Sequence, residues 1–155
     1  MLNTTQLIGF GSGHTGYRYW RLRMMSTVAG SGVNVPILHL RAYVGGPTLC
    51  TGGTAIESSH SGTDEAAGAF VDTRYPLWIA GGKVAGVEWL GYVFPEPVEI
   101  REISWWGEGW TFSPEDFNLE YSVDGVTWLL RQSYTYFGWE DDYGTSSPSV
   151  FLVTE

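Results

Sequence analysis

Three histidines and a pair of serines are the first residues to consider for chemistry. His14, His39 and His60 do not have the spacing of metal ligands, and no Gly-x-Ser-x-Gly nucleophile turn occurs. Ser59, His60 and Asp64 lie close together along the chain and stay open as a Ser-His-Asp arrangement, although geometry in the fold defines such a triad and sequence proximity does not. We therefore predict that the protein is not an enzyme.

A glycine motif and the acidic residues offer two further kinds of chemistry. Residues 11–16 read Gly-Ser-Gly-His-Thr-Gly and match the dinucleotide-binding fingerprint. That fingerprint requires a strand before it and a helix after it, whereas here a strand is predicted to follow, so we reject it. Glu108 with Glu115 or Asp116 is the carboxylate pair to consider for cleaving a glycosidic bond. Seventeen acids make such pairs frequent by chance, and a solvated acidic surface is the favoured interpretation.

Two loops are unusually aromatic. Residues 105–114 read Trp-Trp-Gly-Glu-Gly-Trp-Thr-Phe-Ser-Pro, and residues 134–143 repeat the theme with acids. Gly107 and Gly109 lie between Trp106 and Trp110, which favours an exposed turn. Two indoles in an exposed turn do not stabilise the fold, so they indicate a surface that something else covers. We predict that these two tryptophans, with Glu108, form a binding surface.

The elements that must position these loops are strands. Apolar and polar residues alternate, or apolar residues run together, in short segments separated by Gly, Pro and Ser, and these segments are residues 20–24, 38–44, 87–94, 117–123 and 150–153. The run 87–94 reads as a strand covered on both faces. We predict an all-β chain, a sandwich or a barrel.

Smaller signals refine this prediction. Asp124-Gly125 lies between two apolar runs and predicts a hairpin of adjacent antiparallel strands. The apolar phase slips by one residue between Val98, Ile100 and Ile103, Trp105, which a β-bulge would accommodate. Residues 65–70 are predicted to form one helical turn.

Charges are few and unevenly placed. Eight basic and 17 acidic residues give a net charge of −9, which repels nucleic acid and offers no basic patch for an anionic membrane. Residues 1–56 carry four arginines and no acid, whereas residues 57–155 carry all the acids. This opposition can hold two parts of one fold together or join subunits head to tail, and we favour the intramolecular interpretation.

The remaining composition bounds the organisation of the chain. Cys50 is the only cysteine, which excludes an intrachain disulfide and predicts a small buried side chain. The start lacks the features of a signal peptide, and no apolar run approaches the ~20 residues of a membrane helix. We expect a protein made in a host cytoplasm without membrane insertion, with a flexible arm over residues 1–16 and one domain over residues 17–155.

Several segments together resemble a known family. Residues 113–128 are similar to the Ser-Pro, Phe, Tyr-Ser, Asp-Gly, Trp signature of the discoidin-like domain, also called the coagulation factor V/VIII type C or galactose-binding-like sandwich. Residues 89–103 resemble its central strand pair, and residues 69–78 resemble its early Phe-Asp-Gly to Trp segment. Residues 17–23 and 37–46 resemble its last two strands, which here begin the domain. The chain therefore resembles a circularly permuted member, of the kind found in bacteriophage tail-fibre and virion proteins.

This resemblance implies an antiparallel jelly-roll β-sandwich that binds ligands, often sugars, through loops at one end. By match, the three rim loops are residues 57–66, 72–86 and 105–113. The predicted ligand-binding residues are Trp106, Glu108, Trp110, Arg74, Tyr75 and His60. Many sugar-binding members carry a structural calcium, but the acid usual in the last strand falls near His39 or Arg41 here. We predict no cofactor, with calcium as the one metal that the resemblance suggests.

Two functions fit these features. In the first, aromatic loop tips stack on sugars while acids accept hydroxyl protons. In the second, the same aromatics fill a protein interface in a virion. A single-site lectin binds weakly without multivalency, so we predict a non-enzymatic, phage-type virion surface protein, a decoration or fibre subunit. It would be a homo-oligomer or present in many copies, with other virion proteins and host-surface glycans as partners. The alternative is a stand-alone lectin outside any virion.

One prediction concerns packing alone. Trp128 follows the predicted hairpin, and its strand alternation predicts a core residue whose replacement by alanine costs about 3 to 5 kcal/mol. Trp20 and Trp89 receive the same interpretation.

Overall fold

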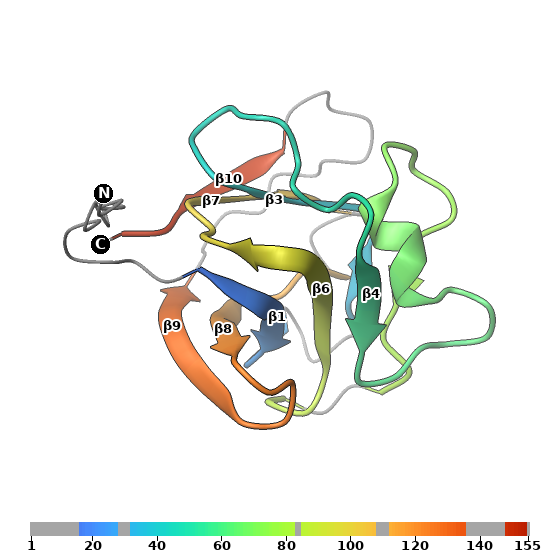
Figure 1. The fold of residues 1–155 in the computed structure, drawn as a ribbon. Helices are drawn as coiled ribbons and strands as arrows, with labels where there is room; N and C mark the ends of the chain where they lie inside the picture. The colour runs from blue at the N-terminus through green and yellow to red at the C-terminus, as the bar shows by residue number, and fades with distance from the viewer. Residues whose placement is uncertain (1–15, 28–31, 83–84, 108–111, 136–147, 155) are drawn as a thin grey trace, which may run out of the picture.

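The strands of this chain form antiparallel sheets, as seen in a computed structural model that describes residues 16–27, 32–82, 85–107, 112–135 and 148–154 (Figure 1). The larger sheet has the order β4 (Thr54–Glu57), β6 (Trp89–Val98), β1 (Tyr17–Met24), β8 (Asp116–Ser122) and β9 (Trp128–Thr135). The smaller sheet has the order β10 (Ser149–Leu152), β7 (Glu102–Trp106) and β3 (Ile37–Arg41). A short pair joins β2 (Asn34–Val35) to β5 (Trp78–Ile79), and a 3-10 helix, η2, covers Ala66–Phe70.

The core lies between the two larger sheets. Along β1, Trp20, Leu22 and Met24 are buried and alternate with Arg21 and Arg23, which point outward. The sheets contact each other through large apolar side chains, listed here by sheet: Trp20, Leu22, Leu90, Phe117 and Leu119 from the larger, and Leu38, Leu40, Ile103, Trp105 and Phe151 from the smaller. The Phe117 ring meets the Phe151 ring edge-on at 4.9 Å. This confirms the predicted all-β chain and its sandwich-like character.

Several local predictions are confirmed. Strand β8 follows the predicted alternation at Phe117 and Leu119, which are buried, but Glu120 and Ser122 on the polar side are buried as well, and Val123 lies beyond the strand and is 76% exposed. Its neighbour β9 is antiparallel to it across the Asp124-Gly125 turn, where Gly125 takes a positive φ of 77°. The predicted helical turn is η2. A strand, β1, does follow the rejected glycine motif, although residues 11–15 themselves lie outside the described residues.

Other local predictions need correction. The β8–β9 ladder ends at the pair Ser122 and Trp128, so the hairpin loop spans residues 123–127 and is longer than a two-residue turn. No bulge causes the predicted phase slip, because β6 ends at Val98, a connection follows, and β7 begins at Glu102. The outer face of β6 is only partly covered, since Trp89 is half-buried there.

Two of the three predicted core tryptophans are not in the core. Trp20 is 1% exposed, as predicted, and its Nε1 donates to the carbonyl oxygens of Tyr17 and Val98. Trp89 and Trp128 are half-buried on the outer face of the larger sheet, where the Arg21 guanidinium lies 5.2 and 4.2 Å from their ring centres. Strand alternation predicts which side chains share a face of a sheet, but these two tryptophans lie on the outer face and not on the face that meets the core.

Opposite charges join distant parts of this one chain. Arg21 on β1 pairs with Glu120 on β8 at 2.6 Å, and Arg41 on β3 pairs with Glu102 on β7. The intramolecular interpretation of the uneven charge is therefore confirmed for these arginines. Within the described ranges, no helix has the length and apolar character needed to cross a membrane. The arm predicted over residues 1–16 lies outside the described residues except for Gly16.

Candidate functional site

The outer face of the smaller sheet carries a connected set of polar side chains. Leu38 and Leu40 point into the core, so His39 and Arg41 point the other way, and they pair across the ladder with Ser104 and Glu102. The Glu102 carboxylate accepts hydrogen bonds from Arg41, from Ser104 Oγ at 2.7 Å and from the Gly45 backbone N–H at 2.7 Å. Glu102 is only 1% exposed, although it lies on a sheet face that usually meets water.

Electrostatics at this pair favour the charged state. Burial alone would raise the pKa of Glu102, but the hydrogen bonds from Ser104, Gly45 and Arg41 outweigh it and hold this pKa below its usual value. The carboxylate therefore stays ionised beside the guanidinium. The pair fixes β3 against β7 and sets the position of the neighbouring His39.

His39 joins this polar set to an exposed acid. Arg41 Nη2 lies 2.9 Å from His39 Nδ1, and a guanidinium can only donate, so Nδ1 is the acceptor. The imidazole proton then lies on Nε2 and is donated to Asp72 Oδ1 at 2.5 Å. The Asp72 side chain is 75% exposed, whereas that of His39 is 13% exposed. One of these hydrogen bonds, from His39 to Asp72, therefore holds loop 71–76 against the sheet, and the other, from Arg41, orients the imidazole.

Trp106 completes this surface. It is the last residue of β7, it is half-buried, and its ring meets the His39 ring at 4.9 Å and 67°. Asp72, His39 and Trp106 therefore bring together the second and third loops predicted for the rim. We call these three residues the Trp106 surface. It offers an indole beside an exposed carboxylate, which is the combination that binds a sugar ring and its hydroxyl groups.

The structure brings together some of the predicted ligand residues. Arg74 and Tyr75 follow Asp72 in the same loop, where Tyr75 is 58% exposed and the Arg74 guanidinium lies 5.3 Å from its ring centre. Glu108 and Trp110 lie outside the described residues, so the predicted partnership with Trp106 and the carboxylate pair involving Glu108 cannot be placed.

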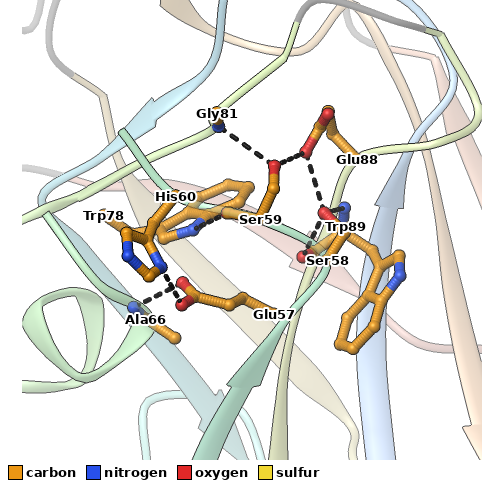
Figure 2. Close-up of polar contacts among 9 residues, drawn as sticks. All are labelled: Glu57, Ser58, Ser59, His60, Ala66, Trp78, Gly81, Glu88 and Trp89. Atoms are coloured by element: carbon orange, nitrogen blue, oxygen red, sulfur yellow. Dashed lines mark hydrogen bonds and ion pairs between the residues drawn. The ribbon is translucent and has the colours of Figure 1, made fainter. Parts of the chain in front are cut away.

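His60 belongs to a separate cluster in the first predicted loop (Figure 2). Its Nδ1 lies 2.7 Å from Glu57 Oε1, and the other oxygen of Glu57 accepts the Ala66 backbone N–H at 2.7 Å. The cluster is joined to the second predicted loop, because the Gly81 N–H donates to Ser59 Oγ at 3.1 Å. The loops predicted for one rim therefore do meet in pairs, but His60 and Trp106 belong to different clusters.

The serines of this cluster are directed away from His60. Ser58 Oγ and Ser59 Oγ donate to the same oxygen of Glu88, at 2.8 and 2.6 Å, and Figure 2 shows the Ser59 hydroxyl pointing to Glu88. Asp64 takes part through its backbone, whose carbonyl accepts from the Ile79 N–H at 3.1 Å. The Ser-His-Asp arrangement that the sequence left open is therefore not formed by these hydrogen bonds.

A calcium ion does not fit the position that the family resemblance suggests. The two residues there are His39, which is bound to Asp72, and Arg41, whose guanidinium already neutralises Glu102. A second cation at this point would meet the arginine charge. Among the described residues, no group of three or more His, Cys, Asp or Glu side chains is placed to hold a metal ion.

Sequence reasoning missed His39 and Asp72 as site residues. The alternation over residues 38–44 did place His39 and Arg41 on one face, which was a usable signal. The contact with Asp72 spans 33 residues and depends on the path of loop 71–76, for which the sequence holds no local pattern. Comparison of the chain with family models, with curated proteins and with solved structures found no match.

Proposed function

We propose that this protein is a non-enzymatic, carbohydrate-binding surface protein of a phage-type virion, built on a discoidin-like, galactose-binding-like jelly roll with permuted strand order. The observation that carries the proposal is the Trp106 surface, in which Asp72 and Trp106 are both fixed by His39. Pyranose C–H groups pack on an indole, and a carboxylate accepts hydrogen bonds from sugar hydroxyls. The exposed Tyr75 in the same loop extends the aromatic area.

A binding role fits this chemistry better than catalysis. Both ring nitrogens of His39 are engaged, one by Arg41 and one by Asp72, so the imidazole has no free lone pair for a substrate proton. The hydroxyl of Ser59 donates to a carboxylate and not to an imidazole. The imidazole that activates the serine of a Ser-His arrangement is therefore not bound to Ser59.

Two features of the fold support the permuted order. The first described strand, β1, lies in the centre of the larger sheet between β6 and β8, a place that suits an internal strand of an unpermuted chain. The described chain also begins and ends near one connection, because Tyr17 pairs with Val98 while the Val153 N–H donates to the Arg101 carbonyl at 2.9 Å. Nearby ends make a permutation possible with one short link.

The virion role rests on the weakness of single sites. One aromatic platform of this size gives low affinity for a sugar, and many copies on one particle raise the avidity without new contacts. A stand-alone lectin is the alternative. Immunogold labelling of purified particles tests this part, because label on the particle surface supports the virion role, and protein found only free of particles supports the stand-alone lectin.

The binding role is tested with a glycan array followed by titration of the glycans that bind. Trp106→Ala and Asp72→Asn should each weaken binding at least tenfold, whereas Trp89→Ala, which removes a half-buried indole from the outer face of the other sheet, should change it less than twofold. Trp106 is half-buried, so we expect its replacement to cost about 0.5 to 3 kcal/mol of stability. Circular dichroism therefore checks the fold of each variant. Normal binding by folded Trp106→Ala protein would contradict the proposed site.

A further inference from the structure

Strand β9 forms an edge of the larger sheet and is unusually apolar for such a place. Among the described residues it pairs on one side only, with β8. Leu129 and Leu130 are 49% and 57% exposed, and the preceding loop adds Val126 at 81%. Exposed edge strands are usually guarded by Lys, Pro or inward-pointing charges, because their free backbone groups can pair with another chain. Residues 128–135 contain no Lys, no Pro and no acid, and the one irregularity of the β8–β9 ladder leaves Arg131 without a partner on β8, next to the regular stretch from Trp128 to Leu130.

The exposed side chains fall on both faces of the sheet. Trp128 and Leu130 pair with Ser122 and Glu120 of β8 and share the outer face, whereas Leu129 pairs with Tyr121 and lies on the inner face. A partner strand on this edge would therefore need apolar residues in the same alternation. A second copy of β9 has the same sequence and therefore the same alternation.

We propose that β9 pairs antiparallel with β9 of a second copy of this chain, about a two-fold axis through Leu129. Residues facing each other across such a ladder must lie on the same face, which requires an axis at a residue and not between two residues. The axis at Leu129 sets Leu129 against its own copy and Trp128 against Leu130 of the partner. Each half of the contact repeats the other, as a closed two-fold dimer requires.

Charges at the ends of this contact are complementary. The same register sets Arg131 of one copy opposite Thr127 of the other. The Asp124 carboxylate accepts the backbone N–H groups of Val126 and Thr127 at 2.9 and 2.7 Å, so it lies beside Thr127. These hydrogen bonds, first that of Thr127, hold the pKa of Asp124 well below its usual range, so it is charged at neutral pH. One nitrogen of the Arg131 guanidinium, Nη2, already donates to the Thr154 carbonyl at 2.5 Å, and its remaining N–H groups would face Asp124 of the partner. Each dimer would thus hold two symmetric Asp124–Arg131 pairs.

The overall charge explains why two copies would meet on this strand. Each chain carries a net charge of −9, which opposes association through most of its surface. Strand β9 carries one arginine and no acid, so it is a place where two copies can approach without placing acids together. This inference does not depend on carbohydrate binding.

Cysteine cross-linking tests the register. Opposite residues in an antiparallel pair have Cα atoms about 4.5 to 5.5 Å apart, which a disulfide can span. Leu129→Cys should form a disulfide-linked dimer under mild oxidation, seen on a non-reducing gel, whereas Val150→Cys on the exposed edge strand β10 should stay monomeric. Val150 is 50% exposed and serves as the matched control, and native Cys50 is buried.

Sedimentation velocity tests the dimer without cysteines. The wild-type protein should show a concentration-dependent dimer, and Leu130→Asp should weaken it at least tenfold while Val150→Asp leaves it unchanged. Because Leu130 is exposed, its replacement should not unfold the monomer. A wild-type protein that is monomeric at every concentration, a dimer that survives Leu130→Asp, or a dimer that Val150→Asp disrupts would each overturn the proposal.

Discussion

Replacing Glu102 by glutamine should be among the costliest changes of a single charge in this protein. Its side chain is 2% exposed, and that of its partner Arg41 is 15% exposed. Glutamine keeps the size of the side chain but removes the charge, which leaves the buried guanidinium without a counter-ion. The Nε of Arg41 has no hydrogen-bond partner among the described residues, so the guanidinium already has one unpaired N–H group and would lose further hydrogen bonding in this variant. Breaking one half of a buried ion pair costs about 3 to 5 kcal/mol.

Glu99→Gln is the matched control for this change. Glu99 pairs with Arg101 at 3.0 Å, but the two side chains are 32% and 25% exposed, so water screens the pair. Removing that charge should cost about 0 to 1 kcal/mol. Urea denaturation followed by far-ultraviolet circular dichroism at pH 7 measures both free energies of unfolding. Equal losses in the two variants would refute the argument from burial.

Acid should remove part of the difference between the wild type and Glu102→Gln. The pKa of Glu102 is lowered in the folded state, so its charge stabilises the fold above the usual glutamate pKa of about 4.3, and this contribution is lost as the pH falls through the lowered pKa. Glutamine does not titrate. The gap in unfolding free energy should therefore be widest near neutral pH and narrow below about pH 4.

Two further predictions follow from burial. Trp20→Ala should lower the free energy of unfolding by about 3 to 5 kcal/mol, because Trp20 is fully buried. Trp128→Ala should lower it by only about 1 to 2 kcal/mol, because the half-buried Trp128 loses mainly its contact with Arg21. The same denaturation assay measures both losses, and a larger loss for Trp128 than for Trp20 would show that Trp128 is a core residue. Burial raises the pKa of Cys50 to about 12, so a thiol reagent such as DTNB should label it in urea but not in the folded protein, and rapid labelling of the folded protein would show that the site opens.

Local alternation predicted much of this fold from the sequence. Strands β1 and β8 each have a polar and an apolar face, and a period of two residues is enough to say which side chains share a face. The Asp124-Gly125 turn is equally local, since Gly125 takes the positive φ that glycine tolerates best.

Contacts between distant segments were much harder to predict. Alternation cannot say whether a tryptophan face meets the core or meets an arginine, and Trp89 and Trp128 were misplaced for that reason. The same limit applies to the candidate site. Trp106 was predicted from its aromatic neighbourhood, but Asp72 and His39 meet only because loop 71–76 turns back onto β3.

The place of β1 and β10 in their sheets decides how this protein would bear a mechanical load. Strand β1 lies in the middle of a sheet, so pulling it along its axis must break the hydrogen bonds to β6 and to β8 at the same time. Strand β10 has one ladder, to β7, supplemented by the side chains of Gln132 and Tyr134 that donate to the Leu152 carbonyl. Tension applied between Tyr17 and Thr154 would therefore peel β10 first, and most of the sandwich would stay folded after that strand had yielded.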